Sequence, residues 1–351
     1  MRHKAVHVKK SPCARERELT AGISVVIAAY HAVRELPVLL DCCAAQTLAP
    51  ALFEIIVVCN GDDDGSSAVV EHFAQAHPQV NVVVHQMEIA NAGAARNAGI
   101  RLASRQFLTF VDADDKIGPR YLEAQWSAAG QTTSSERAAP SVVVLSPLVS
   151  VSADGRAIAN DPLSKKYAAV DPGQHKVADY PWVLSFTACK LLPTKIARSM
   201  RFPEDLRSGE DVVFWAQLLR FPNLRLILAS KPREVEHVRE AERVNPRVNP
   251  EWEDAAYVRV VRPDSVSRQG ESFDFNVVQR LACIDQLRTI RVPVRARKAL
   301  RTRIAAQLDF VVKYLGAHRN EAPAIQAEVL RHPDGRALWR HIVKRRQKRD
   351  R

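Results

Sequence analysis

The sequence predicts an α/β protein, a doubly wound and mainly parallel sheet with a C-terminal helical extension. First, short β-branched apolar runs alternate with segments whose apolar residues recur at helical spacing, the pattern of consecutive βαβ units. Second, these runs are almost continuously apolar, which is typical of strands covered on both faces. Third, from about residue 274 the spacing is helical. Sheets of this kind bind ligands beyond the carboxyl ends of their strands.

The expected elements follow one another in a regular series. Residues 147–180 are rich in Pro, Gly, Asp and Ser and are interpreted as excursions or a flexible flap. The first strands are expected at 23–29, 54–59, 80–85 and 106–111, with helices at 33–46, 65–77 and 92–104, then a helix at 118–129 and a strand at 141–146. Later strands are expected at 224–229 and 255–261, and helices at 274–290, 296–316, 321–331 and 335–346.

The composition is that of a folded globular protein, with 46% hydrophobic and 26% charged residues. No run approaches the roughly 18 apolar residues of a membrane span, and residues 1–20 lack the apolar core of a signal peptide. The six cysteines form no metal-ligand spacing, which indicates reduced thiols in a cytoplasmic protein. We expect a basic flexible leader over 1–20, the α/β domain over 21–270 and a basic helical region over 271–351.

The net charge of +12 is concentrated at the C-terminal end. Residues 288–351 hold 18 Lys and Arg against 5 Asp and Glu, a net of +13, so the remainder is nearly neutral. Such a region can be the solvated face of helices, or it can contact anionic lipid or an anionic acceptor. It has few aromatic residues and no recognised nucleic-acid motif, so nucleic acid is the least favoured partner.

Three carboxylates follow the apolar strand at 106–111: Asp112, Asp114 and Asp115. Like charges so close repel one another and raise one another's pKa values, which indicates that a cation belongs among them. Two carboxylates separated by one residue can face the same volume if the chain turns, and Mg²⁺ or Mn²⁺ suits such oxygen ligands beside substrate phosphates. The alternative is a polar turn after a strand, where Asp is common.

Two further groups of charged residues lie at predicted helix starts. Glu210 and Asp211 open an amphipathic helix, and Ser208 with an acid three positions later is typical of a capping box. Two adjacent acids cannot both cap well, so one of them can instead act as a general base. Arg96 lies among small residues at the start of the helix at 92–104. Its guanidinium can bind phosphate or pair with one of the aspartates, and both roles can hold.

Taken in order, five segments resemble the family-2 glycosyltransferases of the GT-A fold, over about 200 residues from 21 to 220. Three positions depart from the family pattern: Ala28 stands where proline is usual, Asn60 stands where an aspartate commonly binds the nucleoside, and Cys59 replaces the aspartate before it. The segments are ISVVIAAYH (23–31), EIIVVCNGDDDGS (54–66), NAGAARNAG (91–99), FLTFVDADD (107–115) and SGEDVVFW (208–215).

The resemblance implies how a nucleotide-diphosphate sugar would be held. Ala28 and Tyr30, at the turn after the first strand, would contact the base, usually uracil. Asn60 would bind the nucleoside, and Arg96 would face the phosphates. A loop that closes over the diphosphate would contain Arg262 and Ser265.

The resemblance also implies a metal site and a base. Asp112 and Asp114 would form a DxD motif that holds Mn²⁺ or Mg²⁺ against the diphosphate, with Asp112 also contacting the donor. Asp115 would lie near the sugar. Asp211 would be the catalytic base, with Glu210 beside it.

The expected activity is therefore a metal-assisted transfer with inversion, in which one carboxylate removes the acceptor's proton and the diphosphate leaves. We expect a hexosyl or N-acetylhexosaminyl donor, with UDP the favoured nucleotide. The expected acceptor is a hydroxyl of a glycan, of a lipid-linked saccharide or of a teichoic-acid-like polymer. The location would be cytoplasmic, or peripheral on the inner face of the membrane.

Three other classes of protein compete with this interpretation. A phosphatase of the HAD type needs the pattern DxDxT, but Lys116 stands where the threonine belongs. A nucleotidylyltransferase needs a glycine-rich loop with a lysine after the first strand, and AAYHAVRELP (28–37) lacks one. A protein that mainly binds anionic polymers or nucleic acid through its basic end would carry a degenerate GT-A domain.

Overall fold

The computed structural model describes residues 18–130, 142–158, 161–171, 173–229, 255–262 and 272–317. The predicted helices at 321–331 and 335–346 lie outside these residues, as do Ser265 and nearly all of the leader. The chain forms two compact units that interleave along the sequence. The first comprises residues up to 175, 187–201 and 224–261, and the second comprises 176–186, 202–223 and 262 onward. The domain boundaries at residues 20 and 270 stay a prediction.

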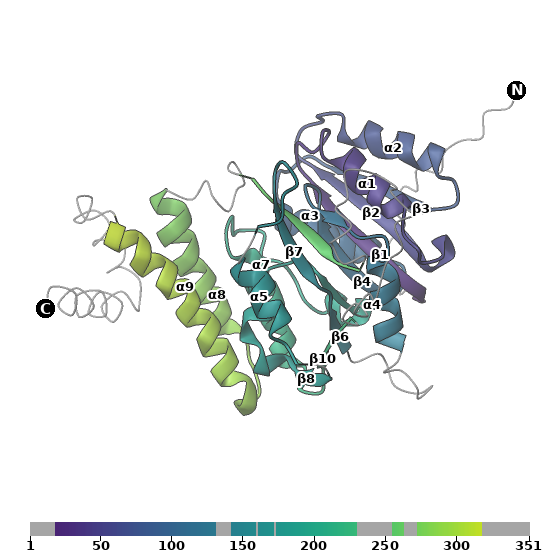
Figure 1. Ribbon diagram of the computed structural model, residues 1–351. Helices are drawn as coiled ribbons and strands as arrows, with labels where there is room; N and C mark the ends of the chain where they lie inside the picture. The colour runs from purple at the N-terminus through teal and green to yellow at the C-terminus, as the bar shows by residue number, and fades with distance from the viewer. Residues whose placement is uncertain are drawn as a thin grey trace, which may run out of the picture. The chain divides into compact units, whose positions relative to one another are not determined.

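The first unit is built on a mixed, mainly parallel sheet, which confirms the predicted α/β class (Figure 1). Its strand order is β3-β2-β1-β4-β9-β6-β10-β8, and β1 to β4 are parallel to their neighbours in that series. Only β9 is antiparallel among the pairings recorded between described strands of this sheet. The strands are β1 (Thr20–Ala29), β2 (Phe53–Asn60), β3 (Asn81–Met87), β4 (Arg105–Asp112), β6 (Val142–Leu145), β8 (Gln174–Lys176), β9 (Lys190–Pro193) and β10 (Arg225–Leu228).

Helices cover this sheet, and β2 is buried along its whole length. Gly99 lets α3 lie directly on β1, because a Cβ at that position would come within 2.2 Å of Val26 Cγ1. The helices of the first unit are α1 (Leu36–Ala44), α2 (Ser66–Ala76), α3 (Ala92–Leu102), α4 (Tyr121–Gly130), α5 (Pro162–Ala168) and α6 (Thr194–Arg198), with a 3₁₀ turn, η1 (Pro50–Leu52).

A second, three-stranded sheet in the same unit has the order β5-β11-β7. It joins β5 (Lys116–Ile117), β11 (Tyr257–Val261) and β7 (Leu148–Ser152). The interpretation of 147–180 as excursions or a flap is therefore corrected, because β7, α5 and β8 lie there. The physical reason is a long-range ion pair: Asp161 caps α5 and also accepts a hydrogen bond from Arg259 of β11 at 2.8 Å.

The second unit is helical in its described residues. Two aromatic rings stack at its centre, Phe202 on Phe214, with centroids 3.8 Å apart. The predicted helix at 274–290 begins as a π-helix, η5 (Asp274–Val278), and continues as α8 (Gln279–Thr289). The other elements are η2 (Val177–Asp179), η3 (Pro181–Ser185), α7 (Glu210–Ala216), η4 (Gln217–Arg220), η6 (Val294–Ala296) and α9 (Arg297–Ala317).

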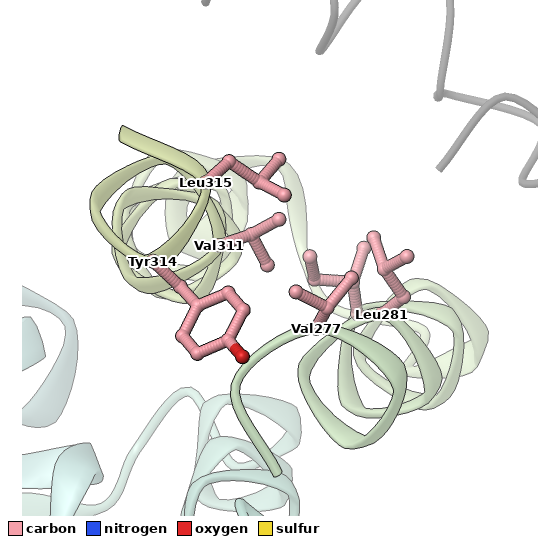
Figure 2. Packing of buried hydrophobic residues seen from close by; sticks show 6 residues of the cluster. Val277, Leu281, Val311, Tyr314 and Leu315 are labelled. Carbon is pink, nitrogen blue, oxygen red and sulfur yellow. The ribbon is translucent and has the colours of Figure 1, made fainter. Parts of the chain in front are cut away.

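Helices α8 and α9 share an apolar core. Figure 2 shows Val311, Tyr314 and Leu315 of α9 directed toward Val277 and Leu281. Ile284 completes this group of buried side chains. Within the described residues, no helix is both long enough and apolar enough to cross a bilayer.

Candidate functional site

The order of the strands places a ligand crevice between β1 and β4. The chain winds from β1 outward to β3 and then returns to the other side of β1 with β4. In open α/β sheets, ligands bind at such a reversal, beyond the carboxyl ends of the strands. Ala28 of β1 pairs with Asp112 of β4 at this point. The predicted residues Ala28 and Asp112 therefore lie side by side at the edge where the topology expects a ligand.

We call Asp112, Asp114 and Asp115 the aspartate edge. Asp112 ends β4 and is half-buried, and its Oδ1 accepts a hydrogen bond from Arg96 Nη2 at 2.9 Å. Arg96 comes from the first turns of α3, and its side chain is only 12% exposed. Of the two roles expected for Arg96, the ion pair is present, and it leaves a cation fixed at the crevice.

Asp115 points away from solvent and is held from the second sheet. Its Oδ2 accepts a hydrogen bond from the Tyr257 hydroxyl at 2.7 Å, and its Oδ1 accepts one from the Val260 amide at 2.8 Å. The Tyr257 oxygen in turn accepts the Asp112 amide at 3.1 Å. One tyrosine thus ties both ends of the aspartate turn to β11. Sequence reasoning missed Tyr257, because its partners lie more than 140 residues away.

The aspartate edge is crowded with negative charge. Burial raises the pKa of the Asp115 carboxyl well above its usual range, and the carboxylates of Asp112 and Asp114 raise it further. The hydrogen bonds from Tyr257 and Val260 oppose this shift without cancelling it. Repulsion of this kind is relieved when a cation binds among the carboxylates.

The turn after β1 presents an exposed aromatic ring. Tyr30 is 56% exposed, and its ring lies so close to Gly61 that a Cβ there would come within 2.9 Å of Tyr30 Cε2. The neighbouring His31 Nε2 pairs with Asp62 Oδ1 at 3.0 Å. This link joins the turns after β1 and β2. A flat ring held at a crevice can stack on a planar ligand.

Asn60 ends β2 and is buried. Its Nδ2 donates to the Ala29 carbonyl at 2.7 Å, and its Oδ1 accepts the Asn91 amide at 3.0 Å. Asn91 in turn caps α3 by accepting the Ala94 amide. Asn60 therefore joins β1 to the start of the helix that carries Arg96. Burial raises the pKa of the preceding Cys59 thiol to about 11, so this residue is a neutral thiol at the position where the resemblance implies an aspartate.

The second carboxylate pair, Glu210 and Asp211, begins α7 in the second unit. The capping-box interpretation is wrong: the N-cap is Gly209, with φ of 87°, and within the first turn the Asp211 Oδ1 accepts the Val212 amide at 2.7 Å. Ser208 is buried before it. Both acids therefore occupy the first turn of α7, where the helix dipole favours negative charge.

Of the two residues predicted for a closing loop, the structure describes one. Arg262 directly follows β11, whose Val260 amide is bonded to Asp115. Ser265 lies outside the described residues.

The aspartate edge suits a divalent cation in its chemistry. Among the described residues, no three His, Cys, Asp or Glu side chains gather as a complete metal cage. Mg²⁺ and Mn²⁺ do not require one, since one or two carboxylates and the phosphates of a substrate suffice. Asp112 and Asp114 are the two candidate carboxylates, beside Asp115, whose pKa is raised by burial and by their charge.

Comparison with known proteins finds a family model that matches part of the chain. Residues 24–135 match the model of glycosyl transferase family 2. An uncharacterized glycosyltransferase of Escherichia coli, YibD, is 35% identical over 112 residues, 31% of either chain. The poly(ribitol-phosphate) beta-N-acetylglucosaminyltransferase TarS of Staphylococcus aureus is 24% identical over 228 residues, which are 62% of this chain and 37% of TarS. The chain spans about a third of the length of the curated relatives it matches.

Solved structures share the fold. A crystal structure of S. aureus TarS residues 1–349 with UDP-GlcNAc superposes with a TM-score of 0.57 at 18% identity, covering 92% of this chain and 79% of that one. A mannosyltransferase of Pyrobaculum calidifontis with GDP-Man and Mn²⁺ superposes with a TM-score of 0.53 at 15% identity, covering 95% and 89%. At these identities the likeness shows the fold, which confirms the predicted GT-A architecture.

Proposed function

Because residues 24–135 match the model of glycosyl transferase family 2, we propose that this protein transfers a sugar from a nucleotide-diphosphate donor to an acceptor hydroxyl with inversion. The observation that carries the proposal is the aspartate edge itself. Asp112 ends β4 at the reversal of strand order, pairs in register with Ala28 and is bonded to Arg96, whose side chain is 12% exposed.

Most of the candidate residues would bind the donor or support its binding site. The Tyr30 ring stacks on the base, and the Arg96 guanidinium faces the diphosphate. Asp112 and Asp114 would hold Mn²⁺ or Mg²⁺, which when bound supplies charge neutralisation at the leaving diphosphate. Asn60 and Asp115 act chiefly by fixing the crevice, because the described structure gives both oxygens of the Asp115 carboxylate a protein donor.

The acceptor side needs a single base. The Asp211 carboxylate removes the proton of the acceptor hydroxyl while that oxygen attacks the anomeric carbon, and the bond to the diphosphate oxygen breaks with its electron pair. A single displacement inverts the anomeric centre. A well-placed base contributes about 10²- to 10⁴-fold in rate. Glu210 shares the helix start, and Arg262 and Ser265 belong to the loop proposed to close over the diphosphate.

The names of the relatives bear on the donor and the acceptor. UDP-GlcNAc is bound to TarS and GDP-Man to the P. calidifontis enzyme, and TarS acts on poly(ribitol-phosphate). We propose a UDP-hexose or UDP-N-acetylhexosamine as donor, and as acceptor a glycan, a lipid-linked saccharide or a teichoic-acid-like polymer.

A thermal-shift panel with UDP, GDP and their sugars, with Mn²⁺ or with EDTA, tests the donor site. Wild type should be stabilised by a nucleotide in Mn²⁺ and not in EDTA, by about 2.7 kcal/mol at a hundredfold excess over Kd. Asp112→Asn and Asp114→Asn should lose this stabilisation. Asp62→Asn is the matched control, because Asp62 is an exposed carboxylate at the same sheet edge whose recorded ion pair is with His31. The absence of metal-dependent stabilisation in wild type would sink the proposed function.

A second candidate role concerns the exposed basic segment, residues 288–301. It contains six Lys and Arg and no Asp or Glu, and all six are exposed. Val294 in its middle is 74% exposed, more than any other large hydrophobic side chain in the described residues. We infer that this segment contacts anionic lipid, since a bilayer surface offers partners for both the cations and the valine, which a polyphosphate chain does not. The protein would then lie on the inner face of the membrane.

Sedimentation with vesicles of phosphatidylcholine alone, or with 30% phosphatidylserine (roughly a physiological anionic fraction), tests this contact. Each cation near an anionic surface contributes about 1 kcal/mol. Arg291→Gln with Arg295→Gln should therefore weaken binding to anionic vesicles by more than tenfold, and Val294→Ser should weaken it less. Binding that persists unchanged in these variants, or that prefers single-stranded RNA over vesicles, would count against a lipid role.

A further inference from the structure

The start of α7 is packed directly against α8. The Cys283 thiol lies against the Gly209 carbonyl, with Sγ 3.5 Å from the oxygen. A Cβ at Gly209 would come within 2.8 Å of Cys283 Sγ and 3.7 Å of Arg280 Nη1. The residue before Glu210 and Asp211 is therefore enclosed by two side chains of α8, one turn apart. Only glycine fits both the space and the left-handed φ of 87°.

Arg280 is held from the other side by α9 and η5. Its Nη1 donates to Gln307 Oε1 at 2.8 Å. Its guanidinium carbon lies 4.6 Å from the centroid of the Phe310 ring and 5.5 Å from that of Phe275. The guanidinium plane is thus fixed by one hydrogen bond and two rings. These contacts orient the cation, but neither ring can neutralise it.

The two acids that begin α7 attract the charge of Arg280. Burial lowers the pKa of the Arg280 guanidinium, and the carboxylates of Asp211 and Glu210 act against this shift. Its Nε is buried without a hydrogen-bond partner in the described structure. A partly buried cation with an unsatisfied N–H is costly to fold, and the attraction of the neighbouring carboxylates offsets part of that cost.

We propose that Arg280 is a positioning residue that holds the carboxylates of Glu210 and Asp211 at the start of α7. The helix pair α8–α9 then sets the geometry of the base: Gln307 and Phe310 fix Arg280, and Arg280 with Cys283 fixes the turn at Gly209. This inference rests on the proposed function, in which Asp211 is the base. It gives the C-terminal helices a role in transfer that is separate from any contact of the basic segment with lipid.

The competing explanation is that Arg280 only joins α8 to α9. The two explanations differ in what a neutral residue does to turnover. Arg280→Gln should lower kcat by about 10- to 100-fold, the size expected when a reacting group is misplaced by about 1 Å, while KM for the donor changes less than about twofold. Arg280→Lys, which keeps the charge, should recover most of the lost kcat. A purely structural role would lower the amount of folded protein without this split.

The outcomes distinguish a failure of the proposed base, Asp211, from a failure of the positioning role of Arg280. Asp211→Asn, assayed in parallel, should lose transfer; if it keeps full activity, the proposed base is wrong whatever Arg280 does. If Asp211→Asn is inactive while folded Arg280→Gln keeps kcat within about twofold of wild type, only the positioning role is overturned. An Arg280→Lys no better than Arg280→Gln overturns it as well. Should Arg280→Gln fail to fold, Gln307→Leu decides, because it releases the guanidinium without changing any charge: a several-fold fall in kcat is expected, and an unchanged kcat overturns the proposal.

Discussion

The aspartate edge and the acidic pair Glu210 and Asp211 are built in opposite ways. The aspartate edge follows a buried strand in a sheet of consecutive βαβ units, so elements that are neighbours in the chain bring it to the sheet edge, and Tyr257 of β11 supports it there. The pair Glu210 and Asp211 opens a helix of seven residues whose start is enclosed by α8, about 70 residues later. A strand end in a parallel sheet is already a ligand edge. A short helix becomes a site only when another helix fixes it.

Disruption of the α8–α9 core should give the largest difference between the two acidic groups, because it should loosen α7 and leave the aspartate edge little changed. Leu281 is 5% exposed in that core, and Leu281→Ala should lower the free energy of unfolding of the second unit by about 2–5 kcal/mol. Hydrogen exchange followed by peptide should show faster exchange in α7, α8 and α9, with β1 to β4 little changed. Asp285→Ala on the exposed side of α8 is the matched control, with an expected change within about 0.5 kcal/mol.

Equal loss of protection in β1 to β4 would break the comparison, because it would mean that the aspartate edge also depends on the C-terminal helices. Measurements of turnover give a second test of the same comparison. In Leu281→Ala, kcat should fall by more than the affinity for the donor does, since Arg280 is the next residue on the same helix.

The converse test perturbs the first unit, at helix α3. At Gly99 an added Cβ would lie 2.2 Å from Val26 Cγ1, so Gly99→Ala should push α3 off β1 and destabilise the protein by about 1–3 kcal/mol. Because α3 carries Arg96, nucleotide stabilisation with Mn²⁺ should weaken too. Adding Val26→Ala makes room for the methyl group, so the double variant should be more stable than the sum of the single changes predicts. Strictly additive effects would contradict the close approach.

The same contrast explains what the sequence could predict. The alternation of apolar runs and helical spacing predicted β1 to β4 and α1 to α3 within a few residues, and with them Asp112 and Arg96 at one edge, whereas Ala28 came from the family resemblance. It could not predict Tyr257 as a support of Asp115, or β7 and α5 within a segment interpreted as a flap. Those contacts join residues 98 to 145 positions apart, and no local pattern encodes them.

At Ser208 the local pattern was misleading for a related reason. The letters of a capping box were present, yet the helix begins after a left-handed glycine that Cys283 requires. Tertiary packing therefore overrode a local capping preference. Arg280 gave no signal at all, because an arginine in an amphipathic helix usually lies on the solvated face.

The smallest expected effect lies in the support of the aspartate edge from β11. Asp161 caps α5 by accepting the amides of Leu163 and Ser164, and it pairs with Arg259 two residues after Tyr257. Burial raises the pKa of Asp161, but those amides and the Arg259 guanidinium outweigh it, so its pKa lies below the usual range. A lowered carboxyl pKa contributes stability that is present above the unfolded value of about 3.9 and is lost as pH falls through the folded value.

Asp161→Asn should lower stability by about 1 kcal/mol at pH 7 and remove that part of the acid dependence. Denaturation at pH 7 and at pH 3 measures both. The donor affinity should hardly change, because Tyr257 and Val260 still bind Asp115; a large loss of donor affinity would show that β11, and not β4, is what positions the aspartate edge.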